Sequence, residues 1–572
     1  MEKTLDKVLH CIEHTLTKND GSTEIKDSGI TQNVKINSLV FDSRDVKENS
    51  LFFALPGTHT TGNRFISQAI LNGAAAVIFQ DDFSAEDKEA IQDAVKQKNA
   101  EPVFIKVESS RKVMSPVSAA FYDNPSSKLV IYGVTGTEGK SSTVSFIWQL
   151  LTLSGYKAGF ISTVQYSLGG PAINNPEHQT TPEAPIVQRE LYEMVQNGCT
   201  HAVVESSSHG LSDKLNRLGD VLFDCAVFMN VTLEHLEFHG TFEQYRNDKA
   251  NLFRALDRHN HIKTINGKET EVSSFGIVNL EDESFPYFVS ATNKKVIGYT
   301  TEGKAGKQAG EEEKKVSPLP AIPEDMAYLS ARNIAAARFG LSFSIHRFQD
   351  HDSIKDENRV IHVKAPLPGA FNAYNIMAAI LAVNGTTGIS LEDLSAKATE
   401  LVPVKGRMTV IDQGQPFEVI VDYAHTPSSF ETIFPPIRKR CTGRMIALFG
   451  SGGERDIKKR PLQGQVAARF CDILILTDED PRQEDSMSIL NMIAEGAKKE
   501  GKVQDKDMFL ISDRIEAIKK AFSIAQKDDI VLLLGKSHEN SIIFKDRVMP
   551  YDEIAQAKKT LTEMGYKENK AN

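Results

Sequence analysis

A glycine-rich segment with the chemistry of a phosphate-binding loop lies near residue 136. It reads Gly133-Val134-Thr135-Gly136-Thr137-Glu138-Gly139-Lys140-Ser141-Ser142. Glycines let backbone N–H groups approach phosphate oxygens, and a helix that begins there adds partial positive charge. Lys140 can neutralise terminal phosphates, and Ser141 can ligate Mg²⁺. Val134 stands where the standard motif has its first glycine, so the segment predicts a nucleoside triphosphate site without defining a reaction.

Acidic and imidazole side chains follow two later strand-like runs. Glu205 stands at the end of HAVVES and His209 follows it, and Glu234, His235 and His239 come after FDCAVFMN. Ligands of open α/β sheets bind at the carboxyl ends of the strands. Mg²⁺ prefers oxygen ligands, whereas imidazole more often binds zinc, and a single histidine near a strand end is usually structural. The combination with a phosphate loop favours a metal and carboxylate cluster on the same rim.

The elements that position these residues divide the chain into three α/β segments. Short strand-like runs mark residues 1–125. A strand, KLVIYGV, and a helical pattern from Lys140 to about Leu153 flank the phosphate loop in residues 126–400, where apolar runs predict a parallel sheet. Strands alternate with helices in residues 401–572, which is typical of a doubly wound, Rossmann-like domain. Residues 301–316 are polar and predict a solvated loop or insertion.

Length and composition agree with about three domains of a soluble protein. The chain has 572 residues, of which 40% are hydrophobic and 25% charged, with a net charge of -10. Five scattered cysteines predict neither a disulfide framework nor a structural zinc site. No signal peptide, membrane span or basic nucleic-acid footprint is present. We therefore expect a cytoplasmic monomer that binds neither membranes nor nucleic acids.

Further motifs, taken together with the phosphate loop, resemble the Mur ligases, and within them the MurE branch, over nearly the whole chain. The matching stretches are Phe41-Asp42-Ser43-Arg44, Gln179-Thr180-Thr181-Pro182, Glu205 to Leu211, Glu234 to His239, Pro368 to Asn375, Lys405-Gly406-Arg407-Met408, Val421 to Pro427, Phe449 to Asp456, Asp478 to Arg482 and Gly535 to Glu539. Each motif alone is weak, but jointly and in this order they are specific. The resemblance implies three α/β domains, which bind a UDP-sugar, ATP and an incoming amino acid in that order along the chain.

The resemblance also implies roles for individual residues. ATP binding is expected from Gly136, Thr137, Glu138, Gly139, Lys140, Ser141, Ser142, Asn372, Asn375, Arg407 and Asp422. UDP-substrate binding is expected from Ser43, Thr180, Thr181, Ser208 and Arg217, and amino-acid binding from Asp480, Pro481, Arg482, Gly535 and Glu539. Mg²⁺ ligation is expected from Ser141, Glu205, His235 and Lys249. In the family that lysine is a carbamate, which turns a cation that would repel the metal into an anion. Lys140, His209 and Lys249 are the expected catalytic residues.

The family reaction joins an amino acid to UDP-N-acetylmuramoyl-L-alanyl-D-glutamate in peptidoglycan synthesis. ATP phosphorylates the free carboxylate, and the incoming amine displaces phosphate from the acyl phosphate. Glu479 and Asp480 stand where the family has Asp-Asn, and Ser537 stands where it has glycine. An added carboxylate favours a second amine, so a dibasic amino acid is expected, with meso-diaminopimelate, lysine and ornithine all open.

Two other readings stay open. Folylpolyglutamate synthetase, a sister ligase, would share the phosphate loop and the lysine. A P-loop protein that binds or hydrolyses ATP without ligation would need no UDP-sugar domain and no second metal cluster, and the departures at Glu138, Glu234 and Ser537 leave room for an inactive homologue.

Overall fold

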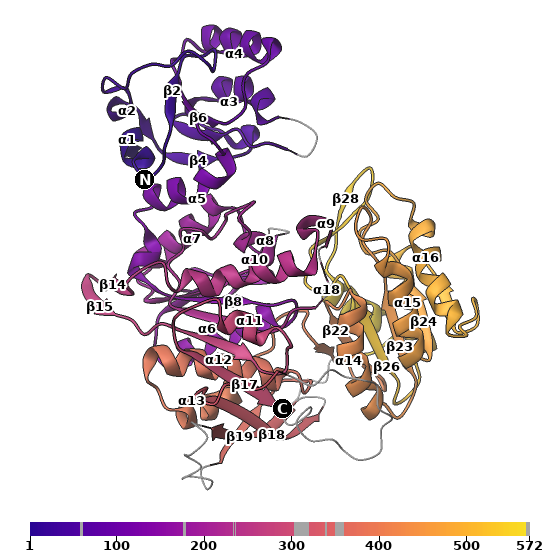
Figure 1. Ribbon diagram of the computed structural model, residues 1–572. Coiled ribbons are helices and arrows are strands. Elements are labelled where there is room, and N and C mark those ends of the chain that lie inside the picture. The colour runs from indigo at the N-terminus through magenta and orange to yellow at the C-terminus, as the bar shows by residue number, and fades with distance from the viewer. Residues whose placement is uncertain are drawn as a thin grey trace.

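The computed structural model describes residues 1–57, 61–175, 179–232, 234, 236–301, 320–337, 340–348 and 360–567. Figure 1 shows three lobes, with the N-terminal lobe above the central lobe and the C-terminal lobe beside it. Of the polar stretch 301–316, all but Thr301 lies outside the described residues. Each lobe is built on its own β-sheet, as the sequence predicted.

The N-terminal lobe is a small α/β layer. Its strand order is β2 (Thr15–Thr17), β7 (Val103–Lys106), β6 (Ala74–Phe79), β5 (Ser50–Phe53) and β4 (Ser38–Val40). β4 to β7 are parallel, and β2 pairs antiparallel with β7. Helix α5 (Ser110–Phe121) packs on one face and α3 (Ile66–Asn72) with α4 (Ala85–Lys98) on the other. The apolar runs AAAVIF and SLFF are buried from both sides, as expected of parallel strands.

The central sheet has a parallel core with antiparallel edges. Its order is β11 (Ile173–Asn174), β10 (Gln165–Ser167), β9 (Ala158–Ile161), β12 (His201–Glu205), β8 (Val130–Thr135), β13 (Cys225–Phe228), β16 (Phe275–Asn279), β17 (Val296–Thr301), β18 (Tyr328–Ala337), β19 (Gly340–Phe348) and β20 (Ile361–Ala365). In this spatial order, each strand from β9 through β12, β8, β13, β16 and β17 to β18 pairs in parallel with the next. The antiparallel additions β10, β11, β19 and β20 extend the predicted parallel sheet.

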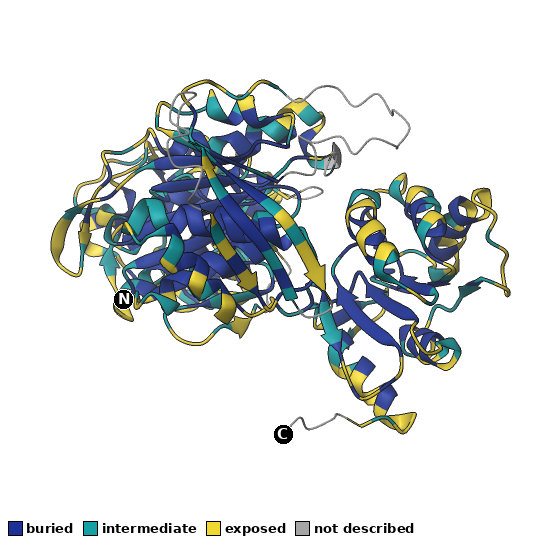
Figure 2. Cartoon of the chain, turned by 90° about the horizontal axis from the view of Figure 1, so that it is seen from below, coloured by how far each residue is buried: buried dark blue, intermediate teal, exposed yellow. Residues whose placement is uncertain are grey.

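Helices cover both faces of this sheet. One core contains α6 (Lys140–Leu153) and α12 (Asn372–Thr387), and the other contains α7 (Ala184–Gln196) and α10 (Phe242–Ala255). The helix predicted from Lys140 to about Leu153 is confirmed. Figure 2 shows the sheet strands as a buried layer between helices whose outer faces are exposed. This layering leaves the carboxyl ends of β8, β12 and β13 free to present polar loops.

The C-terminal lobe has the predicted doubly wound fold. Its strand order is β21 (Thr409–Ile411), β22 (Glu418–Asp422), β26 (Ile530–Leu534), β23 (Met445–Phe449), β24 (Ile473–Leu476) and β25 (Met508–Leu510), parallel except for β21. One face carries α14 (Pro427–Arg440), α15 (Lys459–Phe470) and α16 (Ser486–Lys499), and the other carries α17 (Arg514–Ile524) and α18 (Glu553–Glu563).

The chain passes from the central to the C-terminal lobe through a short linker that is fixed at both ends. Gln149 in α6 donates to the Val402 carbonyl at 3.0 Å and accepts from the Val402 N–H at 2.8 Å. On the far side the Gly406 N–H donates to Thr409, and the Arg407 N–H donates to the Val404 carbonyl. The linker is therefore attached to the helix that follows the phosphate loop.

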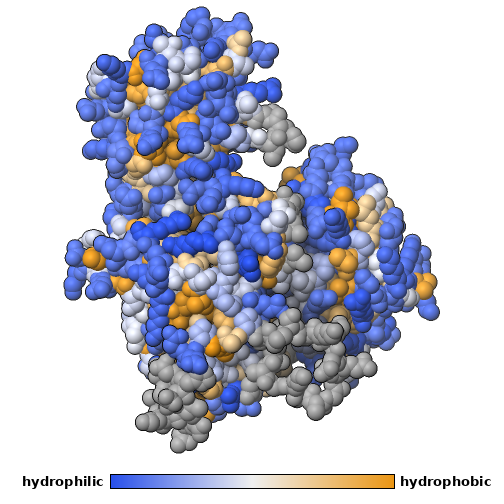
Figure 3. Space-filling view, viewed as in Figure 1, coloured by the Kyte–Doolittle hydropathy of each residue, from blue (hydrophilic) through white to orange (hydrophobic). Residues whose placement is uncertain are grey.

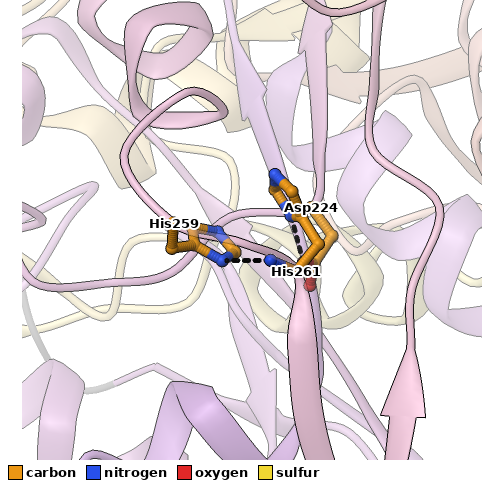
Figure 4. Close-up of side chains that lie close together, drawn as sticks. All are labelled: Asp224, His259 and His261. Carbon is orange, nitrogen blue, oxygen red and sulfur yellow. Dashed lines mark hydrogen bonds and ion pairs between the residues drawn. The ribbon is translucent and has the colours of Figure 1, made fainter.

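Asp224, His259 and His261 lie close together (Figure 4). Asp224 directly precedes β13, so the group lies at the amino ends of the parallel strands, whereas the phosphate loop follows the carboxyl end of β8. Asp224 accepts from Lys263 Nζ at 2.5 Å and pairs with His261 Nδ1 at 2.9 Å. His261 Nε2 contacts the Leu256 carbonyl, and His259 Nε2 contacts the Phe223 carbonyl. Because Lys263 already supplies the cation and the imidazole nitrogens have partners, this group is a structural clamp between β13 and its neighbours rather than a metal centre.

The surface facing the viewer in Figure 3 is mostly hydrophilic, with apolar residues in small groups. Among the described helices none is both long and apolar enough to cross a membrane.

Candidate active site

The phosphate loop joins β8 to α6, as predicted. Gly139 ends the loop with φ +83°, a left-handed conformation that favours glycine. A Cβ at this position would lie 2.8 Å from Asn375 Oδ1. The N–H groups of Thr137 and Glu138 donate to Asn230 Oδ1, so this part of the loop is held by the protein. The first N–H groups of α6 receive no capping side chain from the described residues, so they can bind phosphate.

The two predicted oxygen ligands lie together. Ser141 Oγ donates to Glu205 Oε1 at 3.2 Å, and both residues are buried. Glu205 also accepts from Ser162 and from the Thr163 N–H, which fixes its carboxylate at the end of β12. A hydroxyl and a carboxylate beside a phosphate loop are the donor types that Mg²⁺ takes. The donor set at this edge therefore fits the implied Mg²⁺.

Lys249 lies on α10 against the same loop. Its ammonium donates to the Gly136 carbonyl at 2.6 Å and sits 4.4 Å from the centre of the Tyr245 ring. Burial, reinforced by the charge of Lys140, holds the pKa of Lys249 well below its usual range. An amine that is partly unprotonated can add carbon dioxide, so the environment suits the carbamate that the resemblance implies. Lys140 itself donates to the Thr137 carbonyl at 2.7 Å.

The predicted metal ligand His235 lies outside the described residues. Its neighbour Glu234 is described. The carboxylate of Glu234 lies near enough to that of Glu138 for the two charges to repel each other. Burial, followed by this repulsion, raises the pKa of Glu138 to about 7. Two acids thus meet in front of the loop, where the family has Asn and Asp.

Two of the predicted substrate residues of the central lobe, Thr181 and Arg217, belong to one hydrogen-bonded group. Thr181 Oγ1 donates to the Glu205 carbonyl at 2.8 Å and accepts from the Ser207 N–H. Arg217 donates to the Thr181 carbonyl and to Glu183, which also pairs with Arg111 from the N-terminal lobe. Arg217 therefore joins the group, although its motif match required an insertion. Thr180 directly precedes Thr181 in the chain.

Ser43 lies apart from this group, in the N-terminal lobe. It opens a short 3₁₀ turn, Ser43–Asp45, that follows β4, and its carbonyl accepts from Asn72. Asp42 caps the turn and pairs with Arg44. The structure thus separates the predicted substrate residues into two places, one in each of the first two lobes.

The predicted asparagines of α12 pack behind the phosphate loop. Asn372 accepts from Asn375 at 2.9 Å and donates to the Pro368 carbonyl. Asn375 Oδ1 accepts from Thr143 of α6 at 3.3 Å. Neither side chain caps the helix, because the N-cap position is Phe371 and it makes no capping bond. Their contacts are to the loop region, which is compatible with a place beside the nucleotide.

Arg407 connects the C-terminal lobe to the phosphate loop. Its guanidinium donates to Ser141 Oγ at 3.4 Å and lies 4.8 Å from the Tyr423 ring centre. Asp422 accepts from the Met408 and Ala424 N–H groups and so fixes the turn that carries Arg407. Both predicted nucleotide residues of this lobe therefore meet at the boundary with the central lobe.

The predicted amino-acid residues lie at the carboxyl ends of β24 and β26. Lys536 pairs with Asp480 at 2.9 Å and with Glu539. Asp480 also accepts from the Ile543 N–H. Gly535 has φ +96°, and a Cβ there would lie 3.0 Å from Glu479 Oε2. Pro481 leads into Arg482, which has φ +54°. The charge of Asp480 is thus already neutralised inside the protein.

Glu479 and Arg482 differ from that satisfied group. Glu479 Oε2 and Arg482 Nε are buried and have no hydrogen-bond partner in the described part of the chain. A buried polar atom without a partner is costly, and a binding site is a common reason for one. The unpaired carboxylate oxygen of Glu479 and the unpaired Nε–H of Arg482 could hold an amine and a carboxylate of one small molecule.

One arrangement was not assigned a role from the sequence. His239 contacts Asp248 through Nδ1 at 2.7 Å and Ser208 Oγ through Nε2 at 3.0 Å, and all three residues are buried. His209, one of the expected catalytic residues, packs edge-to-face against His239 with ring centres 5.2 Å apart. Asp248 directly precedes Lys249 in α10 and belongs to no motif, so only its burial in the helix could have drawn attention to it.

Comparisons with known proteins agree with this geometry. Residues 35–122 match the description Mur ligase family, catalytic domain, residues 134–383 the Mur ligase middle domain, and residues 406–537 the Mur ligase, glutamate ligase domain. The chain is 51% identical over 540 residues to a UDP-N-acetylmuramyl-tripeptide synthetase of Treponema denticola, covering 92% of this chain and 94% of that protein. The chain belongs to the Mur ligase family.

Other Mur ligases are similar over comparable lengths. A Borreliella afzelii UDP-N-acetylmuramyl-tripeptide synthetase is 38% identical, with 97% of each chain covered. A Caldanaerobacter subterraneus UDP-N-acetylmuramoyl-L-alanyl-D-glutamate–2,6-diaminopimelate ligase is 34% identical, with 93% and 96% covered. A solved ligase of the latter name shares the fold, with a TM-score of 0.57, 24% identity, and 99% and 100% covered. The three-domain Mur ligase architecture expected from the motifs is confirmed.

Proposed function

We propose that this Mur ligase uses ATP to join a dibasic amino acid to UDP-N-acetylmuramoyl-L-alanyl-D-glutamate, as the third residue of a peptidoglycan precursor. The similarity to tripeptide synthetases over more than nine-tenths of the chain supports the reaction class. The meeting of Ser141, Glu205 and Lys249 around one phosphate loop is the observation that carries the chemistry. We place the reaction in the cytoplasm, in a monomer.

The residues of the site support a division of work. Lys140, the N-terminus of α6 and Arg407 surround the place for the triphosphate, and they can stabilise the charge of a transferring phosphoryl group. Ser141, Glu205 and a carbamate on Lys249 would hold Mg²⁺, which neutralises phosphate charge when bound. Thr181, Arg217 and Ser208 would orient the substrate carboxylate toward the phosphate. Ser43 would hold the uridine end of the substrate in the N-terminal lobe.

We further propose that Glu479 binds the distal amine of the incoming amino acid. Asp480 is neutralised by Lys536, whereas the buried Glu479 oxygen has no partner in the described residues. Arg482 would then hold a carboxylate, bidentately where the geometry allows. The pair favours lysine or ornithine if Arg482 binds the α-carboxylate, and diaminopimelate if it binds a distal one.

The test is phosphate release by the purified chain with ATP, Mg²⁺ and the UDP-dipeptide, against diaminopimelate, lysine, ornithine and norleucine, which lacks the distal amine. Release that needs both the UDP-dipeptide and one dibasic amino acid supports the ligase. Release without an acceptor would instead identify an uncoupled ATPase. Equal use of norleucine and lysine would contradict the role of Glu479.

Discrimination between the dibasic amino acid and norleucine should fall when Glu479 is substituted and not when its neighbour Asp480 is substituted. Glu479→Gln is expected to lower kcat/KM for the preferred dibasic amino acid by about 10–10²-fold, as expected when a buried charge pair loses one partner, while leaving norleucine unchanged. Asp480→Asn is the matched control, because its carboxylate pairs with Lys536 and is not free for the amino acid. A larger loss in Asp480→Asn for lysine alone would reassign the amine to Asp480.

A further inference from the structure

A buried serine, histidine and aspartate form a continuous chain beside the substrate group. Ser208 stands at the start of α8 (Ser208–Leu211), His239 at the end of α9 (Leu236–His239), and Asp248 inside α10. The distances are 3.0 Å from Ser208 Oγ to His239 Nε2 and 2.7 Å from His239 Nδ1 to Asp248 Oδ2. Gln244 Nε2 donates to the other Asp248 oxygen at 2.7 Å. Both carboxylate oxygens are therefore held.

These contacts define the state of the imidazole. A carboxylate only accepts hydrogen bonds, so the proton of neutral His239 lies on Nδ1 and points to Asp248. Nε2 is then unprotonated and accepts from the Ser208 hydroxyl. Among the described residues none donates to Ser208 Oγ, so its lone pairs can accept a hydrogen bond from another group. The chain is thus arranged to take a proton at Ser208 and store it on His239, beside a carboxylate that stabilises the imidazolium.

Ser208 adjoins the residues that connect the substrate group to the phosphate loop. Its neighbour Ser207 donates its N–H to Thr181, whose hydroxyl donates to the Glu205 carbonyl. Glu205 in turn contacts Ser141 of the phosphate loop. Ser208 therefore directly follows, along the chain, a residue bonded to the group at which we propose that the acyl phosphate forms.

The geometry points to Ser208, His239 and Asp248 as the relay that removes the proton from the incoming amino acid. This inference rests on the proposed ligase reaction. An amino acid enters as an ammonium ion, which has no lone pair for attack. Ser208 takes one proton from it as the Ser208 proton passes to His239 Nε2. The amine then attacks the acyl carbon, and the bond from carbon to the phosphate oxygen breaks.

Two protons remain on the attacking nitrogen. One stays in the amide, and the other goes to the departing phosphate, which leaves as hydrogen phosphate with the electron pair of the broken bond. The imidazolium returns its proton through Ser208 to solvent when the product leaves. Ser208 is the residue that touches the reacting amine, whereas His239 and Asp248 act through it and position its hydroxyl. The relay is separate from Glu205 and Lys249, which serve the phosphate.

The experiment compares two nucleophiles on the full-length enzyme. The incoming amino acid must lose a proton before it attacks, whereas hydroxylamine is largely uncharged at neutral pH and traps the acyl phosphate as a hydroxamate. Asp248→Asn and His239→Gln are the test variants. Asn can accept from Gln244 and donate to His239 Nδ1, which moves the imidazole proton to Nε2, and Gln can retain a bond to Ser208, but neither variant supports an imidazolium there. Glu243→Gln, an exposed acid-to-amide change in the same helix, is the control.

We expect both variants to lower kcat with the amino acid by ~10²-fold or more, with little change in KM, because that is the usual contribution of proton transfer. Hydroxamate formation should stay near the wild-type rate. Equal loss with both nucleophiles, or no loss with either, would overturn the relay. A wild-type enzyme that forms neither tripeptide nor hydroxamate would instead refute the proposed function. A circular dichroism melt of Asp248→Asn keeps loss of folding distinct from loss of the proton step.

Discussion

Gly139 tests the phosphate loop at the scale of one side chain. Gly139→Ala places a methyl group 2.8 Å from Asn375 Oδ1 and forces a left-handed φ on alanine. We expect at least a ~10-fold rise in the KM for ATP, because the loop and Asn375 must both move. The KM for ATP is measured from reaction rates over a range of ATP concentrations at saturating UDP-dipeptide.

Gly155 supplies the matched control, since it ends the same helix with φ +88° and has open space where a Cβ would lie. Gly155→Ala should cost about 1 kcal/mol of stability and leave the KM for ATP unchanged. If both variants raised that KM equally, general loosening of α6 would explain the effect rather than the nucleotide contact.

The residues that could be predicted from sequence were those held in contiguous motifs. Lys140, Ser141 and Glu205 stand next to strand ends, so local patterns place them. Asp248 could not be found this way, because its partners His239 and Ser208 are brought to it by folding of three separate helices. The distinction between Glu479 and Asp480 also needed the structure, since Lys536 pairs with Asp480 and not with Glu479.

At the scale of elements, a buried ion pair fastens α17 to α18. Arg514 donates to both Glu553 oxygens, and both side chains are fully buried. Glu553→Gln should cost about 3–5 kcal/mol, because it leaves the Arg514 charge unpaired in the interior. Urea unfolding of the C-terminal transition measures this, and a loss below 1 kcal/mol would mean that water reaches Arg514 in solution.

Ser537 connects the segment Gly535 to Glu539, which holds predicted amino-acid-binding residues, to the interdomain linker. Its hydroxyl donates to the Gly406 carbonyl, although its φ of +43° suits glycine better. Ser537→Ala should therefore cost about 1–2 kcal/mol, whereas Ser537→Gly should cost less because it relieves the backbone. Melting temperatures of the two variants compare the effects, and a more stable Ala variant would show that the hydrogen bond contributes nothing.

Most elements were predictable, and the exceptions have a physical cause. The buried parallel strands β8, β12 and β22 to β26 read as apolar runs, so the sequence indicates them directly. The antiparallel pair β18–β19, which lies inside the edge strand β20, was not predicted. Its register shifts between Arg332 and Ala335, which breaks the regular alternation by which antiparallel strands are recognised.

At the scale of the whole molecule, the protonation of Glu138, which lies at the boundary between two lobes, makes the stability of the protein depend on pH. It faces Glu234 across the loop and Arg407 and Asp422 of the C-terminal lobe. Folding raises its pKa from 4.5 to about 7. The folded state then binds the proton more tightly, so the stability of the protein falls as the pH rises through that window.

Glu138→Asn, which restores the usual family residue, should remove this dependence. Without nucleotide, the variant is expected to be about 1–3 kcal/mol more stable than the wild type at pH 8 and nearly equal to it at pH 4. Thermal melts over that range give the comparison, with Glu243→Gln as the exposed control. A stability difference that is constant with pH would assign the effect to packing instead of charge.

The two-point hydrogen bond between Gln149 and Val402 limits how the C-terminal lobe can travel. Val402 moves with α6, and from Val404 onward the backbone is tied to the C-terminal lobe. The rotatable bonds between the lobes are thus concentrated at Pro403, whose ring already fixes φ. A rotation of the C-terminal lobe would therefore turn about almost a single pivot. Each such rotation would return Arg407 to the same position, with little conformational entropy to lose.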